Sequence, residues 1–415
     1  MKRQTRIAIV FGTRPEVIKL APVVRELRRH GWCNVLLIPS GQHHELLAQS
    51  MAECGFMSDA LPAPPMSAMN LAEMSSKLTS RLTFEFSRSR PDLVLVHGDT
   101  MTALAGARAA SRLGLSLGQV EAGLRTFNLK HPFPEEVIRQ AITPLAQLHF
   151  APTPTAVANL LQAGVAPGSI FLTGNTIVDH LKHTLNGELA GVVPAPFILV
   201  TLHRRELAPH IDRVVSGLLA ALEANAALRA TVVLHPNPLI STPLRERLRR
   251  RPNIELISPL PHRQFLEVVR ATSAVVTDSG GVQEEAAILG KPLVVVRKVT
   301  ERPEIMLGDR AVIAGFDPIT IKEAIDWAIG LQAVHSLQRW FGDGCAAERI
   351  VDAAGKFLSA RQSKGDECWR SPQERLCTFQ FSLHEEGPAV TTKLLTQSAS
   401  FKTRQLGRID SSGHY

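Results

Sequence analysis

The stretch AVVTDSGGVQEEA, residues 274–286, joins an apolar run to a turn with two glycines and then to the start of a helix. The run 274–277 predicts a buried strand. A helix that begins directly after a strand aims free backbone N–H groups at an anion, and glycines let a phosphate approach the main chain. A plain helix start, with Ser279 or Asp278 as N-cap, is the alternative interpretation. The stretch by itself therefore leaves a phosphate site and a structural cap equally open.

Short β-branched runs recur along the whole chain, with helical stretches between them. Continuous apolar strands bounded by helices are typical of parallel sheets covered on both faces. The runs form two sets, which predicts an α/β protein with two doubly wound domains and ligands outside the C-terminal strand ends. The predicted strands are 7–11, 35–38, 93–97, 117–120, 148–151, 170–173, 197–201, 231–234, 254–257, 274–277, 293–297 and 311–314.

Changes in composition divide the chain into segments. The polar, Pro-rich stretch 186–196 predicts a boundary, so we expect one domain over 1–185 and another over 186–336. Residues 337–360 form a C-terminal region in which 338–359 reads as helical. From Arg361 the alternation stops and no apolar stripe persists, which predicts a polar extension without its own core over 361–415.

Overall composition indicates a soluble protein that binds small anionic molecules. The 415 residues carry a formal net charge of +8, which suits anionic substrates. We see no nucleic-acid-binding motif, and 5% aromatic residues leave few platforms for base stacking. Five cysteines, at positions 33, 54, 345, 368 and 377, have no CxxC spacing. We therefore expect reduced thiols in the cytoplasm, no disulfide framework and no zinc site. No stretch is apolar over the roughly 18 residues that a membrane span needs.

Charged side chains follow many of the predicted strands. Any one of these motifs is explained as well by a cap or a surface ion pair, but their shared position at the carboxyl ends of parallel strands favours a site. The motifs are Gly12–Glu16 with Lys19 one turn later, His97–Thr100 with Asp99, Glu121–Thr126, Pro132–Glu136 with Glu135, His203–Glu206, and His235–Pro238.

Taken in order, the motifs resemble a known enzyme family. GTRPEVIK, HGDT, VEAGLRT, PFPEE, FAPT, TGNT, HRRE, HPNP, TDSGGVQEEA, LGKP and TERPE are similar to those of the non-hydrolysing UDP-N-acetylglucosamine 2-epimerases. The resemblance runs from about residue 7 to residue 357. It implies the two-domain GT-B fold, in agreement with the predicted strands, and a final helix that packs back onto the first domain.

The resemblance also implies a role for individual residues. Ser279, Gly280 and Gly281 would bind the diphosphate together with Arg302, Glu285 would hold the ribose hydroxyls, and Phe265 would border the uracil. Arg14, Lys19 and His203 would line the cleft near the diphosphate, and His235 belongs to the same substrate-binding set. Asp99, Glu121 and Glu135 would face the sugar and, with His203, form the catalytic set.

The implied reaction inverts C2 of UDP-GlcNAc to give UDP-ManNAc. UDP leaves C1, a 2-acetamidoglucal forms, and UDP returns after C2 is protonated from the other face. This route needs acid/base groups and cations but no cofactor and no metal. The sequence has no GxGxxG, DxD or clustered His/Cys motif, and its one tyrosine is Tyr415. The resemblance further implies a homodimer, a second UDP-GlcNAc as activator and a place in polysaccharide biosynthesis.

Several positions depart from the family pattern. The family usually has Asp at Lys298, Gly at Phe127, Ser at His131, Asn at Ile138 and Arg at His44, and a different continuation at 207–209. Of these positions, His44 bears on the site where the resemblance implies a second, activating substrate molecule. The alternatives that remain are an epimerase of a modified UDP-2-acetamido sugar, a GT-B glycosyltransferase, a hydrolysing epimerase and a nucleotide-sugar-binding regulator without catalysis.

Overall fold

The computed structural model describes residues 4–42, 45–56, 58, 69–189, 197–331 and 339–363. All of them belong to one unit, Met1–Trp369. Residue His44, most of the predicted boundary 186–196, and the predicted extension from 364 onward lie outside the described residues.

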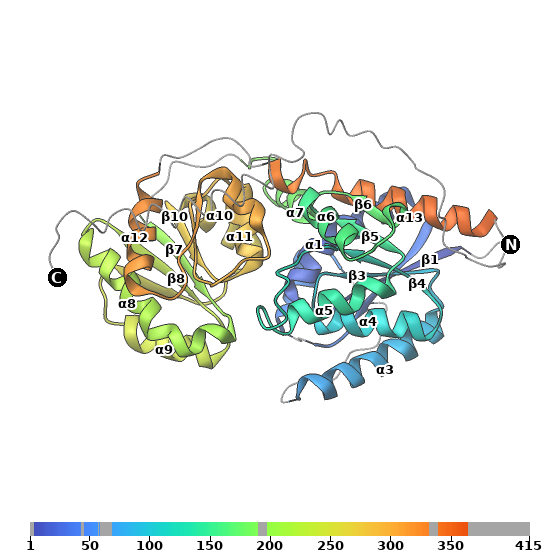
Figure 1. Ribbon diagram of the computed structural model, residues 1–415, viewed down its shortest axis with the longest axis horizontal. Coiled ribbons are helices and arrows are strands. Elements are labelled where there is room, and N and C mark those ends of the chain that lie inside the picture. The colour runs from blue at the N-terminus through green and yellow to red at the C-terminus, as the bar shows by residue number, and fades with distance from the viewer. Residues whose placement is uncertain are drawn as a thin grey trace, which may run out of the picture. The chain divides into compact units, whose positions relative to one another are not determined.

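Two parallel sheets of six strands each organise the chain (Figure 1). The first has the order β2-β1-β3-β4-β5-β6 and the second the order β12-β11-β10-β7-β8-β9. The predicted α/β class with two doubly wound sheets is confirmed, and every predicted strand is present to within two residues at each end. The strands are β1 (Thr5–Phe11), β2 (Cys33–Pro39), β3 (Leu93–His97), β4 (Ser116–Val120), β5 (Leu148–Ala151), β6 (Ile170–Leu172), β7 (Phe197–Leu202), β8 (Arg229–Leu234), β9 (Ile254–Ile257), β10 (Ala274–Thr277), β11 (Leu293–Val295) and β12 (Ala311–Ile313).

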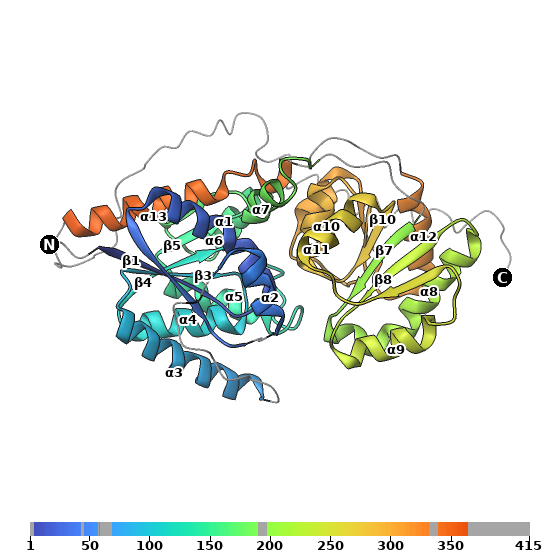
Figure 2. The same cartoon turned by 180° about the vertical axis from the view of Figure 1, so that it is seen from behind.

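Helices cover both faces of each sheet, as the two opposite views show (Figures 1 and 2). Alternate residues of β1 enter different cores: Ile7 and Ile9 pack with one set of helices, and Ala8 and Val10 with another. The α-helices are α1 (Arg14–His30), α2 (Glu45–Glu53), α3 (Leu71–Ser89), α4 (Met101–Arg112), α5 (Glu135–Ile142), α6 (Pro154–Gln162), α7 (Thr176–Thr184), α8 (Ile211–Ala224), α9 (Pro238–Leu248), α10 (His262–Ala271), α11 (Gly280–Ile288), α12 (Pro318–Ile329) and α13 (Ala346–Ser363).

The strand order reverses direction at one point in each sheet. In the first sheet β1 lies between β2 and β3, and in the second β10 lies beside β7. The crevice at such a point, outside the carboxyl ends of the strands, is where open α/β sheets bind ligands. The loops that follow β1, β3, β7 and β10 carry Thr13, Asp99, His203 and Asp278. The fold therefore brings the polar motifs to the expected edges.

Helix α13 returns to the first sheet after the chain has passed through the second. Its residues Ile350, Val351, Ala354 and Leu358 share a core with Ile7 and other residues of β1, α1 and β2. The predicted helix 338–359 is divided, because a short 3-10 turn (Arg339–Phe341) precedes α13. The α-helix also extends to Ser363, three residues into the segment that the sequence assigns to the extension.

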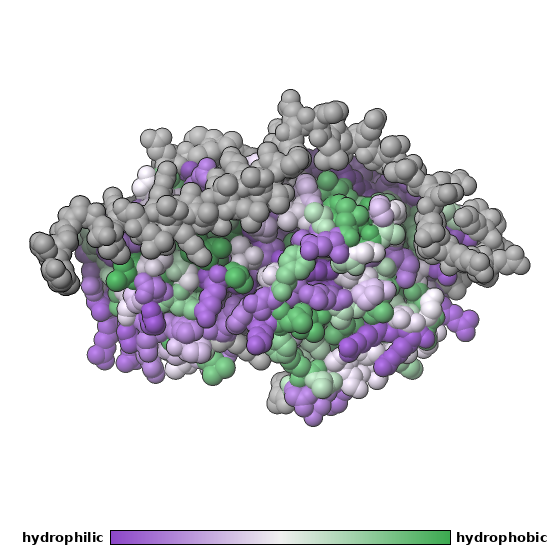
Figure 3. All heavy atoms as spheres, viewed as in Figure 1, coloured by the Kyte–Doolittle hydropathy of each residue, from purple (hydrophilic) through white to green (hydrophobic). Residues whose placement is uncertain are grey.

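We call the part of the chain built on the first sheet the first lobe and the part built on the second sheet the second lobe. Basic residues on the second lobe lie on a solvated surface. Arg247 contacts Asp212 at 2.9 Å, and Arg251 contacts Glu223 at 3.2 Å. Figure 3 shows a mainly hydrophilic surface over α8 and α9. Within the residues described, no helix has the length and hydropathy of a membrane span.

Candidate active site

The loop after β1 is shaped by Glu16. Its Oε2 accepts hydrogen bonds from the backbone N–H groups of Gly12 and Thr13, both at 2.8 Å, and its Oε1 accepts one from Thr100 at 2.5 Å. Burial raises the pKa of Glu16, although these hydrogen bonds oppose the shift. The loop is thereby fixed from inside, and Arg14 at its tip donates to the carbonyl of Leu260 in the second lobe at 3.1 Å.

Lys19 joins the two lobes through two carboxylates. Its Nζ contacts Glu121, and it lies 2.7 Å from Oε2 of Glu284 on α11. Burial raises the pKa of Glu121, but Lys19, His97 and Arg302 outweigh it and hold that pKa well below its usual range. Glu121 has φ of 61°, a left-handed conformation that costs energy for a non-glycine residue and recurs at functional sites. Lys19 is therefore engaged by one acid from each lobe.

Arg302 is the cationic centre on the second lobe. Its Nε lies 2.5 Å from Oε1 of Glu284, Nη1 contacts Glu301, and Nη2 lies 3.7 Å from Oε1 of Glu121. Burial lowers the pKa of Arg302, but these three carboxylates reverse the shift and hold it well above its ordinary value. Arg302 therefore remains charged although it is almost entirely buried.

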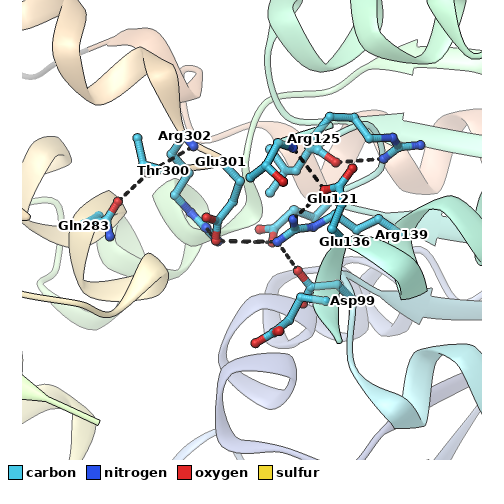
Figure 4. A network of polar contacts seen from close by, with 12 residues as sticks. Asp99, Glu121, Arg125, Glu136, Arg139, Gln283, Thr300, Glu301 and Arg302 are labelled. Atoms are coloured by element: carbon cyan, nitrogen blue, oxygen red, sulfur yellow. Dashed lines mark hydrogen bonds and ion pairs between the residues drawn. The ribbon is translucent and has the colours of Figure 1, made fainter. Parts of the chain in front are cut away.

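Asp99 and Glu301 meet at Arg139. Nη2 of Arg139 contacts Asp99 and lies 3.5 Å from Oε1 of Glu301, and Nη1 lies 3.1 Å from Glu136. Figure 4 shows Glu301 reaching from beside Arg302 toward Arg139, which comes from the first lobe, and Asp99 approaching the same end of that guanidinium. The acidic and cationic motifs of both lobes thus form one continuous polar network.

Glu135 differs from the other carboxylates in having few partners. Its Oε1 lies 3.5 Å from Nη1 of Arg204, and its Oε2 is buried without a hydrogen-bond partner. Burial raises the pKa of Glu135, Arg204 opposes the shift, and Asp99 adds to it. The surroundings of Glu135 therefore favour its protonated form more than water would.

His203 is held by Asp278 at the end of β10. Nδ1 of His203 lies 2.9 Å from Oδ1 of Asp278. Oδ1 also accepts from the backbone N–H of His203, and Oδ2 accepts from that of Arg204. Burial raises the pKa of Asp278, but His203 and these hydrogen bonds lower it overall. The ring of His235 lies 5.6 Å from that of His203, centroid to centroid. Asp278 thus anchors the strand end and orients His203.

The start of α11 has the predicted strand, turn and helix. Oγ of Ser279 accepts from the N–H of Val282, so Ser279 is the N-cap. Gly280 lies against Arg302, whereas a Cβ at Gly281 would meet open space. Both features expected from the sequence are therefore present: Ser279 caps α11, and the first turn of the helix is open beside Gly281.

Glu285 and Phe265 lie deeper in the second lobe. Oε1 of Glu285 is 2.8 Å from Nε2 of His262, and both side chains are buried. Phe265 belongs to the apolar core of this lobe and is 8% exposed.

The network includes five charged residues to which the sequence analysis gave no role. Glu284, Glu301, Arg139 and Arg204 bridge the predicted residues, and Asp278 appeared there only as a candidate cap. All five stand in or within one helical turn of the quoted motifs, so their position was a signal. What the sequence did not reveal was that Lys19, Arg139, Arg204 and Arg302 each contact an acid of the other lobe as well as acids of their own.

The departures from the family pattern fall in three kinds of place: the buried core, an exposed loop and the lining of a cavity. Ile138 is buried in the core beside α4, and Leu207 in the core beside α8. Phe127 is exposed and has φ of 57°, the left-handed region that favours the family's glycine. Lys298 and His131 line a cavity of about 60 Å³ together with Glu206, His210, Arg297, Val299 and Phe316. None of these substitutions removes a predicted acid.

In the part of the chain that the structure describes, no cluster of three or more His, Cys, Asp or Glu side chains has the geometry of a metal site. Cys33, Cys54 and Cys345 are free thiols. Burial raises the pKa of Cys33 and of Cys54 to about 11, which makes both poor nucleophiles at neutral pH.

Comparisons with known proteins agree with this geometry. The family described as UDP-N-acetylglucosamine 2-epimerase matches residues 25–355. UDP-N-acetylglucosamine 2-epimerase of Bacillus subtilis is 36% identical over 360 residues, which cover 84% of this chain and 95% of that protein.

Two solved structures extend the comparison to the fold. UDP-GlcNAc 2-epimerase from Neisseria meningitidis, bound to UDP-GlcNAc, superposes with a TM-score of 0.80 at 32% identity, covering 85% of this chain and 100% of that one. The Methanocaldococcus jannaschii enzyme, in complex with UDP-GlcNAc and UDP, gives 0.76 at 31% identity with the same coverage. The two six-stranded sheets have the GT-B-like arrangement of these structures. The chain belongs to the UDP-N-acetylglucosamine 2-epimerase family, whose members are isomerases.

Proposed function

We propose that this chain interconverts UDP-GlcNAc and UDP-ManNAc by eliminating UDP and adding it back. The Neisseria structure with UDP-GlcNAc and the Methanocaldococcus structure with UDP-GlcNAc and UDP support the substrate class. The intact polar network supports the elimination route.

The chemistry dictates the order of bond changes. C2 carries an acetamido group and no neighbouring carbonyl, so its proton is not acidic enough for direct removal. Breaking the C1–O bond first sends the electron pair out with UDP and leaves cation character at C1. A base then takes the C2 proton, and a C1=C2 double bond forms the 2-acetamidoglucal. Protonation of C2 from the opposite face and attack of UDP oxygen on C1 give the epimer.

The observation that carries the proposal is a pair of linked carboxyl groups whose pKa values are shifted in opposite directions. The pKa of Glu135 is raised, mainly by burial, whereas cations hold the pKa of Glu121 well below its usual range. They are linked through Arg204, Glu301 and Arg302. Two acids whose environments separate their pKa values divide acid/base and electrostatic roles between them.

The opposite pKa shifts of Glu121 and Glu135 suggest a role for each catalytic residue. Glu121, held as a carboxylate, stabilises cation character at C1. Glu135 and Asp99 exchange the C2 proton on opposite faces of the ring, and the reverse reaction exchanges their roles. His203 assists departure of UDP. Arg302, Arg14 and Lys19 compensate the diphosphate charge together with the N-terminus of α11 formed by Ser279, Gly280 and Gly281.

The nucleoside end is assigned to the second lobe. Glu285 holds the ribose hydroxyls, Phe265 borders the uracil, and His235 supports His203 at the cleft. On this assignment the first lobe carries the acid/base groups and the second lobe carries the nucleotide. We also propose that the protein acts as a homodimer in the cytoplasm.

Incubation with UDP-GlcNAc in D₂O, followed by NMR of C2, tests the reaction. We expect deuterium at C2 of UDP-ManNAc, with traces of UDP and 2-acetamidoglucal. Product that retains its original C2 hydrogen would exclude the elimination route. Accumulation of free N-acetylmannosamine would identify a hydrolysing epimerase.

The same sample separates the remaining alternatives. A glycosyltransferase without acceptor would leave C2 protonated, and a regulator would bind UDP-GlcNAc without any exchange. Glu135→Gln is the control, since it should bind the substrate and leave C2 unlabelled.

A further inference from the structure

Two histidines form a buried series behind the carboxylate assigned to the ribose. Nε2 of His262 on α10 lies 2.8 Å from Oε1 of Glu285, and Nδ1 of His262 lies 3.1 Å from Nε2 of His180 on α7. The exposed fractions of His180, His262 and Glu285 are 5%, 5% and 6%. At this depth water does not compete for the polar atoms, so each contact constrains its neighbours.

The acceptor character of Glu285 sets the direction of the hydrogen bonds. An ionised carboxylate only accepts, so Nε2 of His262 carries a proton and donates it. Nδ1 of His262 then accepts from Nε2–H of His180, because a proton on Nδ1 of His262 would move the proton of neutral His180 to its own buried Nδ1, which has no acceptor. Oγ1 of Thr184, 3.1 Å from the same nitrogen of His180, shares this proton.

His180 is suited to remain neutral in this arrangement. Its Nδ1 is buried and has no hydrogen-bond partner, as expected for the unprotonated nitrogen of this tautomer. Burial lowers the pKa of His180 well below its usual range, with further contributions from His262 and Arg25. A neutral His180 keeps its donor directed at His262, and His262 keeps its donor directed at Glu285.

We propose that His262 is a positioning residue for nucleotide binding, which fixes the Glu285 carboxylate for the ribose, and that His180 selects the His262 tautomer required. The inference rests on the proposed assignment of Glu285 to the ribose hydroxyls. His262 anchors Oε1 of Glu285, which leaves Oε2 to accept from a hydroxyl. The cost of ordering this side chain is then met before the nucleotide arrives.

The three residues come from helices that meet between the lobes. Helix α7 packs on both α1 and α11. The backbone N–H of His262 donates to Oε2 of Glu53 on α2 at 3.2 Å. The position of His262 is therefore fixed from both lobes, and its side chain is the link from this junction to the nucleotide site.

Calorimetry with two nucleotides tests the proposal on the full chain. The probes are UDP and 2′,3′-dideoxy-UDP, which lacks both ribose hydroxyls. His262→Asn shortens the side chain so that its amide cannot replace Nε2, whereas the longer amide of His262→Gln can donate near that position. We expect His262→Asn to weaken UDP binding roughly 10-fold and to leave dideoxy-UDP binding within about 2-fold. His262→Gln should restore most of the preference for UDP.

Kinetics give a second readout. His262→Asn should raise KM for UDP-GlcNAc while kcat at saturation changes by less than about 3-fold. His180→Leu should shift the ¹⁵N resonances of His262 toward a mixture of tautomers and weaken UDP binding by a smaller factor. His183→Ala is the matched control, because His183 is exposed on the same helix and should change neither affinity nor spectrum.

Glu285→Gln distinguishes an error in the assignment of Glu285 to the ribose from an error in the positioning role of His262. If this variant keeps the full preference for UDP over dideoxy-UDP, the assignment of Glu285 to the ribose is wrong. If Glu285→Gln loses the preference and His262→Asn keeps it, the positioning role of His262 is wrong. Equal behaviour of the Asn and Gln variants would also overturn it, since only one of them can donate to Glu285.

Discussion

Gly280 lies directly against the guanidinium of Arg302: a Cβ at position 280 would stand 2.7 Å from Cζ of that arginine. The guanidinium has little freedom to move aside, because Nε is bound to Glu284 and Nη1 to Glu301. The neighbouring Gly281 has open space where its Cβ would be. The two adjacent glycines therefore differ: Gly280 makes room for Arg302, whereas the side of Gly281 is open.

Gly280→Ala should destabilise the ligand-free protein by about 1–3 kcal/mol, the usual cost of overpacking a filled site. Gly281→Ala is the matched control. It should leave stability unchanged or raise it slightly, because alanine favours helix over glycine by about 1 kcal/mol. Thermal unfolding of the two variants without nucleotide measures the difference. Equal melting temperatures would show that the Arg302 side chain moves to make room for the methyl group added at position 280.

Glu135→Gln should lower kcat by about 100-fold or more while UDP affinity stays near that of the unsubstituted protein. Because the folded state raises the pKa of Glu135, the stability linked to its protonation is present at low pH and lost as pH rises through that raised pKa. Gln removes this cost, so the melting temperature at pH 7 should be unchanged or higher. Turnover assays, calorimetry with UDP and thermal unfolding check these points.

Glu136→Gln provides the contrast on the next residue. Glu136 is fully buried and binds the backbone N–H of Thr126 at 3.0 Å and Nη1 of Arg139 at 3.1 Å. Its replacement should lower the melting temperature, as expected for a structural acid. A stable Glu136→Gln protein, or an active Glu135→Gln protein, would contradict this division between neighbours.

Glu301→Gln should destabilise the protein by about 3–5 kcal/mol at pH 7, because it leaves buried arginines without their carboxylate. Burial raises the pKa of Glu301, but Arg302, Arg297, Arg139 and Arg204 hold it well below its usual range. The stabilisation is therefore present above the ordinary Glu pKa of about 4.3 and is lost as pH falls from there through the folded-state value.

Melting temperatures of Glu301→Gln and of the unsubstituted protein should consequently converge in acid. The exposed Glu323 on α12 offers a control, and Glu323→Gln should have little effect at any pH. If the difference in melting temperature between Glu301→Gln and the unsubstituted protein widened toward low pH, Glu301 would not be an ionised carboxylate paired with several arginines.

Phe127→Gly should stabilise the protein by about 0.5–1 kcal/mol. A non-glycine residue in the left-handed region costs roughly 1–2 kcal/mol, part of which the greater freedom of glycine in the unfolded chain offsets. Phe127 is 59% exposed, so little buried area is lost. Leu129 is 52% exposed in the same loop without a positive φ, and Leu129→Gly should destabilise instead. Thermal unfolding of both variants decides the point.

The sequence predicted the strands well because they are short β-branched runs, and the central ones, such as 93–97 and 274–277, are buried on both faces. It also predicted which motifs gather, since parallel strands bring their carboxyl ends to one edge. It did not predict that Lys19 contacts Glu121 and Glu284 together, because that depends on how the two lobes meet. Likewise, nothing in the spacing of His180 and His262 indicates that they touch, as 82 residues separate them.

The return of α13 to the first sheet has a consequence for synthesis on the ribosome. The face of β1 and α1 that receives Ile350 and Leu358 stays uncovered until the entire second lobe has been translated. At about 5–20 residues per second, the stretch from the end of α7 at Thr184 to the start of α13 at Ala346 takes roughly 8–30 s. During that interval the nascent first lobe exposes an apolar surface, and this is the window in which a chaperone would bind it.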